Sequence, residues 1–266
     1  MSLLLKDWKE VYRSHLYWIG SGMIAFVSLL ILWQVTHLQG DIRFSAALMP
    51  LFRINLYFVP FMALIVSSML VLQEKSQRTL FVLLSSHFSP LRFLLEKSIS
   101  IHLILFSMIL SSYFLVLLIS RLFLQADFLP FLAFLLSILA LSAVFAQIGI
   151  CVGVAMNHKM AAFAVCLLIW AGFLYVYDLV LIYVIPGIGT DELFFFSLFY
   201  FFSPVHAIEY FLSVQLGFYP LDRNSAIFNQ VLFRSPRLVL AANFLFWAGV
   251  SIIISHLVLK RKGIRE

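Results

Sequence analysis

Ionisable side chains inside long apolar segments are the residues of this sequence best suited to chemistry, and Asp178 is the most isolated of them. It is the only acidic residue well inside the run WAGFLYVYDLVLIYVIP. An ionised carboxylate among lipid-like groups costs about 2.5 kcal/mol or more, so we expect Asp178 to face a bundle interior, a cavity or a partner cation, or to be protonated. Two interpretations stay open: a structural contact (a helix cap or a dimer contact) and a place on a translocation path.

A second polar group, formed by Pro204, His206 and Glu209, lies in LFFFSLFYFFSPVHAIEYFL, the segment 193–212. This segment is long enough to cross a membrane. However, proline removes a backbone donor and clashes with the preceding turn, and a glutamate at mid-membrane adds a further cost. We therefore predict two shorter helices that re-enter the membrane or lie at its outer interface, in place of a seventh span.

Patterns of established catalytic sites are absent from the sequence. It has no HExxH, no GxSxG and no phosphate-binding loop, and no two of its seven histidines are four residues apart. Cys151 and Cys166 form no CxxC pair, and the scattered methionines form no array. We therefore expect no catalytic residue, no metal site and no cofactor in this chain. Any ATP would have to be bound by another subunit.

Other polar residues within apolar segments favour roles in helix packing. Gly20-Ser21-Gly22 is more typical of a close helix contact than of a nucleophile. His102, Asn243 and His256 are expected to form hydrogen bonds between packed helices.

Composition indicates which elements must hold these residues. The chain has 266 residues, of which 63% are hydrophobic and only 11% charged. Soluble proteins are about a quarter charged, so the solvent of this chain must be lipid. The net charge of +6 comes from basic residues at the ends of apolar segments. That distribution indicates membrane orientation and not nucleic-acid binding.

Six segments are long and apolar enough to be membrane spans. An amphipathic surface helix is predicted before them at 3–14, with Leu3–Leu5, Trp8 and Tyr12 on its apolar face. The positive-inside rule barely separates six spans from seven. With six, both termini are cytoplasmic in a multi-pass protein of the cell (inner) membrane. The fold expected is all-α, a single transmembrane domain over 1–266, with spans at about 17–35, 54–72, 99–120, 131–156, 160–185 and 238–259.

Two connections are long, 73–98 on the cytoplasmic side and 186–237 on the outer side, and long connections tend to be functional. In the first, Leu80, Leu83, Leu84 and Phe88 recur at helical spacing, and Thr79 is placed to cap such a helix. An apolar face on this helix needs a cover, either the membrane surface or a groove on another protein.

The 73–98 stretch resembles the coupling segment of ABC-2 type transporter permeases, which sits on the ATPase subunit. That family has a glutamate at the end of the second span, followed by a Gly-Thr-Leu-x-x-Leu-Leu-Ser-x-Pro-x-Ser-Arg…Gly-Lys stretch. This sequence departs from the pattern at Arg78, His87, Pro90 and Glu96. The resemblance implies that coupling to the ATPase involves the matching residues, which are Glu74, Thr79, Leu80, Leu83, Leu84, Ser85, Ser89 and Lys97.

Two later stretches, YDLVLIYVI and SPVHAIEYF, are similar to the NosY-type branch of that family, whose transporters help mature the copper centres of nitrous oxide reductase. The matching positions are Asp178, Pro204 and Ala207, whereas His206 and Glu209 differ from the branch pattern. The resemblance places Asp178 on the translocation path or the dimer interface. It places Pro204, His206 and Glu209 in an outer re-entrant segment.

The partners that the resemblance implies follow from the family. They are cytoplasmic ABC ATPase subunits, which bind the ATP and Mg, a second permease copy forming a homodimer, a periplasmic accessory protein and membrane lipid. The implied function is export or conformational signalling across the membrane. The alternative is a membrane scaffold or assembly protein that transports nothing.

Overall fold

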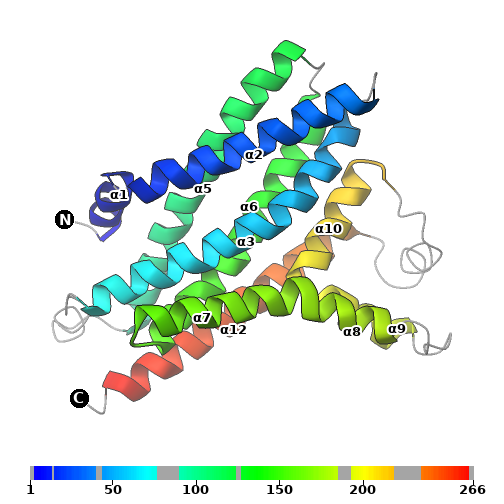
Figure 1. Ribbon diagram of the computed structural model, residues 1–266. Coiled ribbons are helices and arrows are strands. Elements are labelled where there is room, and N and C mark those ends of the chain that lie inside the picture. The colour runs from blue at the N-terminus through cyan, green and yellow to red at the C-terminus, as the bar shows by residue number, and fades with distance from the viewer. Residues whose placement is uncertain are drawn as a thin grey trace.

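The computed structural model describes residues 3–13, 15–39, 44–76, 90–123, 127–184, 193–218 and 235–263. Within these ranges the regular elements are helices, as predicted (Figure 1). In chain order they are α1 (Leu3–Arg13), α2 (His15–Gln39), α3 (Phe44–Ser76), α5 (Pro90–Phe123), α6 (Phe128–Ala155), α7 (Lys159–Ala171), the π-helical turn η1 (Gly172–Val176), α8 (Tyr177–Val184), α9 (Leu193–Phe202), α10 (Pro204–Gln215) and α12 (Pro236–Gly263).

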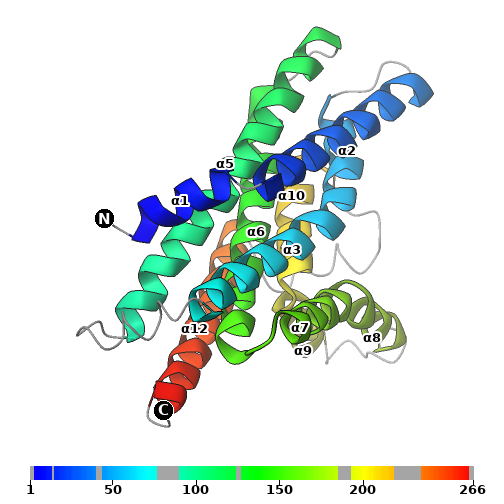
Figure 2. The same ribbon diagram turned by 60° about the vertical axis from the view of Figure 1, so that its left-hand side comes forward.

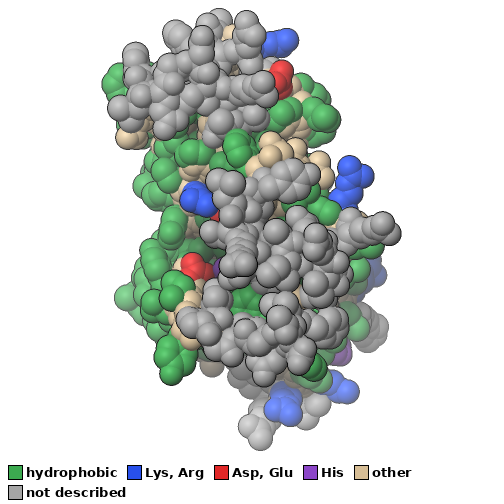
Figure 3. Space-filling model, turned by 90° about the vertical axis from the view of Figure 1, so that its right-hand side faces the viewer, with side chains coloured by type: hydrophobic (Ala, Val, Ile, Leu, Met, Phe, Trp, Pro, Cys, Tyr) green, Lys and Arg blue, Asp and Glu red, His purple; other side chains and the backbone are tan. Residues whose placement is uncertain are grey.

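In the described part of the chain, six helices are long and apolar enough to cross a membrane. They are α2, α3, α5, α6, the continuous α7–η1–α8 unit and α12. Large hydrophobic side chains such as Trp18, Phe114 and Tyr183 are exposed on their surfaces. Where side chains are described, much of the face shown in Figure 3 is hydrophobic, with few charged groups between. The chain is therefore a multi-pass membrane protein, and the predicted all-α class is confirmed.

Two helices extend well beyond the predicted spans. α3 begins at Phe44 instead of Ile54 and ends at Ser76, and α5 begins at Pro90 instead of Ile99. The predicted 73–98 loop was therefore too long, because its two ends are helical and only 77–89 lies outside the described residues. The hydropathy pattern missed the turns at 73–76 and 90–98 because they carry polar side chains, of which Glu74 and Lys97 pair with each other.

The helices alternate in direction, so the molecule has two ends. The terminal end holds α1, the last turn of α3, the first turns of α5 and α7, and the last turns of α6 and α12 (Figures 1 and 2). The distal end holds α8, α9 and the start of α12 (Figure 1).

Among the described helices, the most extensive contact is between α3 and α6. It depends on Gly149 and Gly153, four residues apart on one face of α6. A Cβ atom at Gly149 would lie 2.6 Å from the Leu64 carbonyl oxygen, and one at Gly153 would lie 2.7 Å from that of Ser68. Only glycine lets the two backbones approach this closely, as in other small-residue contacts within membranes.

The helix predicted at 3–14 forms as α1, and it packs on its own chain through a face that the prediction did not identify. Asp7 and Val11 are buried, whereas Trp8 and Tyr12, which were predicted on the apolar face toward the membrane surface, are 39% and 48% exposed. The reason is that α1 lies on α5 and α2 of its own chain. An acidic side chain can be buried there because α5 supplies partners for it. The exposed aromatic rings are of the kind that sit at membrane interfaces.

α2 packs on α5 through small and polar residues, as predicted for Gly20-Ser21-Gly22. The Ser21 hydroxyl lies 2.9 Å from that of Ser112, and a Cβ at Gly20 would meet the Met108 side chain. Gly22, by contrast, has nothing within 4 Å of its Cβ position among the described residues.

The segment predicted to break does so. α9 and α10 meet at Ser203 with an angle of 97°, and Pro204 is the first residue of α10. Proline is favoured at that position because its missing N–H would be unpaired there in any case.

Candidate functional site

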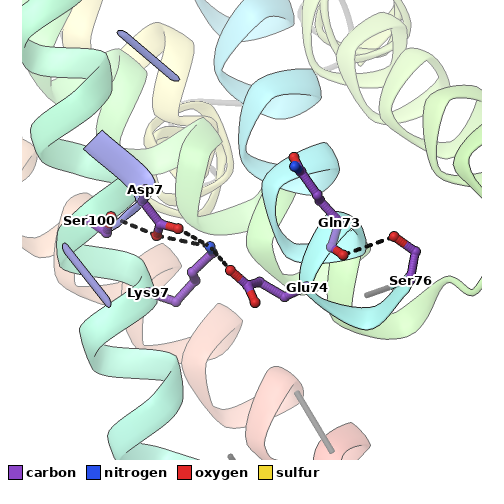
Figure 4. A network of polar contacts seen from close by, with 6 residues as sticks. All are labelled: Asp7, Gln73, Glu74, Ser76, Lys97 and Ser100. Carbon is purple, nitrogen blue, oxygen red and sulfur yellow. Dashed lines mark hydrogen bonds and ion pairs between the residues drawn. The ribbon is translucent and has the colours of Figure 1, made fainter. Parts of the chain in front are cut away.

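Three ionisable side chains meet inside the terminal end of the bundle. The Lys97 ammonium donates to both carboxylate oxygens of Asp7 at 2.9 Å and to Oε1 of Glu74 at 3.3 Å (Figure 4). The Ser100 hydroxyl donates to Oδ2 of Asp7 at 2.8 Å. Asp7 comes from α1, Glu74 from α3 and Lys97 from α5. We call Asp7, Glu74 and Lys97 the charge triad.

The charge triad is almost fully buried, so the loss of any one member would cost much stability. The side chains of Asp7 and Lys97 are 1% exposed and that of Glu74 is 4% exposed. Removing one partner from a buried ion pair leaves an uncompensated charge and typically costs about 3–5 kcal/mol. The triad therefore fixes α1, α3 and α5 to one another at the point where α3 ends and α5 begins.

Lys75, the neighbour of Glu74, fastens the same turn of α3 to α6. Its ammonium donates to the carbonyl oxygens of Val154 and Met156, the latter at 2.8 Å. These carbonyls lie at the C-terminal end of α6, where backbone acceptors lack helical partners and a cation is favourable. Both helices that flank 77–89 are thus held by polar contacts within the chain.

The predicted coupling residues divide between this site and the segment beside it. Glu74 and Lys97 are brought together, but they are buried, so they hold the helix ends and cannot offer themselves to a partner surface. The other six lie outside the described residues: Thr79, Leu80, Leu83, Leu84, Ser85 and Ser89.

Asp178 and His206 come together near the distal end, although 28 positions separate their numbers. Nε2 of His206 lies 3.2 Å from Oδ1 of Asp178. The Asp178 side chain is 53% exposed and that of His206 is 11% exposed. The edge of the His206 ring meets Tyr200 at a centroid distance of 4.6 Å. Asp178 therefore faces a partner cation when His206 is protonated, one of the environments expected for it, and it is not a buried helix cap.

His206 also has a buried nitrogen, Nδ1, with no hydrogen-bond partner among the described residues. Tyr177, which precedes Asp178, stacks on Phe199 at 5.1 Å, and its hydroxyl donates to the Phe199 carbonyl. The end of the fifth span is thereby attached to both halves of the broken pair. The π-helical turn η1 lies directly before Tyr177, and such turns are frequent at functional sites.

The break between α9 and α10 exposes carbonyl oxygens at the end of α9, and α12 satisfies them. Asn243 Nδ2 donates to Phe201 at 2.7 Å and to Phe202 at 3.1 Å, and the Trp247 indole donates to Phe202 at 3.0 Å. In an apolar environment each unsatisfied carbonyl would cost several kcal/mol. The prediction that Asn243 bonds between helices is confirmed, and these bonds explain how a bent helix can persist here.

Glu209, the remaining predicted residue of the outer segment, has a cationic neighbour on α3. Nε of Arg53 lies 3.5 Å from Oε1 of Glu209. The Arg53 side chain is 69% exposed and that of Glu209 is 28% exposed, so the pair contributes little to stability. It nevertheless links α3 directly to α10.

Of the other polar residues, His102 links α5 to α6, as predicted: Nδ1 lies 2.6 Å from the Ser98 carbonyl oxygen and Nε2 lies 3.2 Å from that of Ala143. Nδ1 of His256 is buried and has no partner among the described residues, so the same prediction fails for that atom. In the described ranges, no three histidine, cysteine or acidic side chains are placed to hold one metal ion.

Sequence reasoning missed Asp7, Arg53, Lys75 and Ser100. Asp7 had a signal, since it lies four residues before Val11 on a face of α1 that is otherwise apolar. An acid on such a face requires a buried cation. Nothing in the local pattern identified Lys97 of α5, 90 positions away, as that cation.

Comparison of the sequence with models of known protein families and with curated proteins finds no match.

Proposed function

We propose that this chain is the membrane-spanning permease subunit of an ABC-2 type transporter, with its ATPase in a separate cytoplasmic subunit. The observation that carries the proposal is the charge triad, because it joins the two helices that flank 77–89 and the surface helix α1 into one rigid end. A force applied to 77–89 would then move α1, α3 and α5 together. This is the mechanical requirement for coupling nucleotide hydrolysis to a membrane bundle.

α3 offers a route for that movement across the membrane. It runs unbroken from the charge triad to Arg53, which pairs with Glu209 of α10. His206, on the same short helix, pairs with Asp178 of the fifth span. In the proposed mechanism the ATPases close on ATP and α3 shifts as a rigid body. The broken pair and Asp178 then change position at the outer side.

The second permease copy in this proposal would use the fifth span. Only 17% of that span is buried within the chain, against 56% for α3. Leu179, Ile182 and Tyr183 form an exposed face on α8. We propose a homodimer in which the first, second and fifth spans line the path or the interface. The resemblance to NosY-type permeases is the support for a role in metalloenzyme maturation with a periplasmic accessory protein.

Affinity purification of the tagged chain from its own cells in a mild detergent tests the partnership. We expect an ABC-type ATPase to copurify in a one-to-one ratio with the permease. A preparation without any nucleotide-binding chain would contradict the transporter proposal and favour the scaffold alternative.

A double substitution in 77–89 tests the coupling itself. Leu83→Asp with Leu84→Asp should abolish copurification or permease-dependent ATP hydrolysis, because two carboxylates would enter an apolar contact. His158→Asp with Met160→Asp is the matched control. It adds the same charge at the exposed start of α7, where acids suit the cap and first turn of a helix. Equal ATPase activity in the two variants would exclude coupling through 77–89.

A further inference from the structure

A cavity of about 780 Å³ lies between α5, α6, α10 and α12, apart from the sites described above. α6 packs against the other three helices, and the cavity lies between them with one side open. Its walls are mainly hydrophobic, with Leu132, Leu136 and Leu139 of α6 facing Phe106 of α5 and Phe244 of α12. A cavity of this size and character lies in the range of small-molecule sites in proteins.

The cavity is long and has a polar mouth. Its α6 lining runs from Leu129 to Ala143, a rise of roughly 21 Å at 1.5 Å per residue. That is somewhat more than one leaflet, since the hydrocarbon core of a bilayer is about 30 Å thick. Arg237, Gln215 and Leu129 line the cavity from the first turn of α12, the last turn of α10 and the first turn of α6, respectively. The occupant therefore needs a polar head and an apolar tail.

The polar groups at the mouth have no partner of their own among the described residues. Neither Arg237 nor Gln215 forms an ion pair or a side-chain hydrogen bond within the part of the chain that the structure describes. His102, the other polar residue of the lining, already has a backbone carbonyl beside each ring nitrogen. Among the described lining residues, the charged group without a partner is thus the Arg237 guanidinium, whose planar donors match phosphate oxygens.

We propose that this cavity binds an anionic phospholipid of the surrounding bilayer, with an acyl chain along α6 and its phosphate on Arg237. The bound lipid would join α5 and α6 to α10 and α12, and so stabilise the distal end of the molecule. This inference does not depend on the transporter proposal.

Lipid binding to the purified, delipidated full chain tests the proposal. The probes are phosphatidylglycerol, phosphatidylcholine with the same acyl chains, and inorganic phosphate. Native mass spectrometry counts bound lipid, and intrinsic tryptophan fluorescence gives the unfolding temperature. We expect one tightly bound phosphatidylglycerol, an affinity at least tenfold above that of phosphatidylcholine, and a raised unfolding temperature. Inorganic phosphate alone should have no effect at millimolar concentration.

Two substitutions separate the head site from the tail site. Arg237→Gln should weaken phosphatidylglycerol binding about tenfold or more, as expected for the loss of a charge-assisted hydrogen bond, and leave phosphatidylcholine unchanged. Arg121→Gln is the matched control, because it removes the same charge near the end of α5 and does not line the cavity. Ala140→Phe, within the apolar wall, should reduce binding of both lipids.

Photo-crosslinking with an acyl-chain diazirine analogue of phosphatidylglycerol checks the position in the unmodified protein, so the test does not depend on a variant folding. Labelled peptides should come from α6 and α12. Equal loss of affinity in Arg237→Gln and Arg121→Gln would overturn the proposal, as would strong binding of phosphate alone. Crosslinks confined to α2 or α8, or an Ala140→Phe variant that keeps its lipid, would do so as well.

Discussion

The α3–α6 pair and the fifth span, α7–η1–α8, are similarly apolar, but they differ in how much of each helix is buried within the chain. Their mean hydropathies are 2.0, 2.5 and 2.2, yet 56% and 50% of the first two are buried within the chain, against 17% of the fifth span. Gly149 and Gly153 lie against the backbone of α3, whereas a Cβ at Gly172 of the fifth span would have nothing within 4 Å among the described residues.

Hydropathy therefore places a helix in the membrane, and small residues decide how tightly it packs there. Lipid tails are as apolar as leucine, so an exposed apolar face costs nothing in a bilayer and close contact must come from shape and hydrogen bonds. α3 and α6 form the rigid body of this protein. The fifth span packs on α3 through α7 and is joined to α9 and α10 by a few polar contacts, while much of its surface is exposed.

The largest expected effect comes from placing one methyl group in the tight contact. Gly149→Ala would bring a Cβ to 2.6 Å from the Leu64 carbonyl oxygen and 3.0 Å from its Cα, and this backbone cannot move without separating α3 from α6. We expect a loss of at least about 3 kcal/mol of stability, or no folded protein. Reversible unfolding in detergent, followed by circular dichroism, measures it.

The same substitution in the fifth span is the control that sharpens the comparison. Gly172→Ala should be neutral or stabilising by about 0.5–1 kcal/mol, because alanine is the better helix former and nothing obstructs its methyl group. Equal destabilisation by the two alanines would contradict the division into a tight and a loose region.

The next largest effect should come from the charge triad. Lys97→Met leaves Asp7 and Glu74 buried without their cation, and we expect a loss of about 3–5 kcal/mol. Arg92→Met removes a cation from the same helix, but the side chains of Arg92 and Glu96 are 66% and 31% exposed, so its effect should stay below about 1 kcal/mol. Similar unfolding free energies for both variants would mean that the triad does not hold the terminal end together.

Sequence reasoning succeeded where one local rule was enough. The apolar lengths predicted six membrane helices, and the Ser203-Pro204 pair predicted the break between α9 and α10, because span length and the missing proline donor are local properties. The ends of α3 and α5 were placed wrongly because their polar turns are stabilised by contacts between distant helices.

The candidate sites also depend on contacts between distant helices, which local sequence rules do not reveal. Asp178 was recognised because its charge contradicts its surroundings, whereas its neighbour His206 lies on another helix and could be placed beside it only by the fold. Lys97 and Glu74 were assigned to coupling with an ATPase by the resemblance alone, and no local pattern predicted that they would be buried against each other. Their burial depends on Asp7 of the surface helix, a pairing across 90 positions that no periodicity reveals.

The smallest effect on stability is expected at Asp178. A substitution there is also the sharpest test of the loosely packed region, the fifth span. Asp178→Asn removes one charge from a side chain that is 53% exposed, and it keeps an oxygen that can accept a hydrogen bond from His206. The unfolding free energy should change by less than about 1 kcal/mol, and assembly should persist. Under the proposed transporter function, we expect permease-dependent ATP hydrolysis or transport to fall, because the contact between the fifth span and α10 would lose its negative charge.

Two measurements together decide what the loose region contributes. Lower activity with unchanged stability would assign the fifth span to function and the α3–α6 pair to the frame that supports it. Unchanged activity would leave Asp178 as a structural contact only. A stability loss of more than about 2 kcal/mol would show that the fifth span is held far more firmly than its exposed surface indicates. Lys97→Met is the reference for the other case. In that variant, activity should fall only because less of the protein is folded.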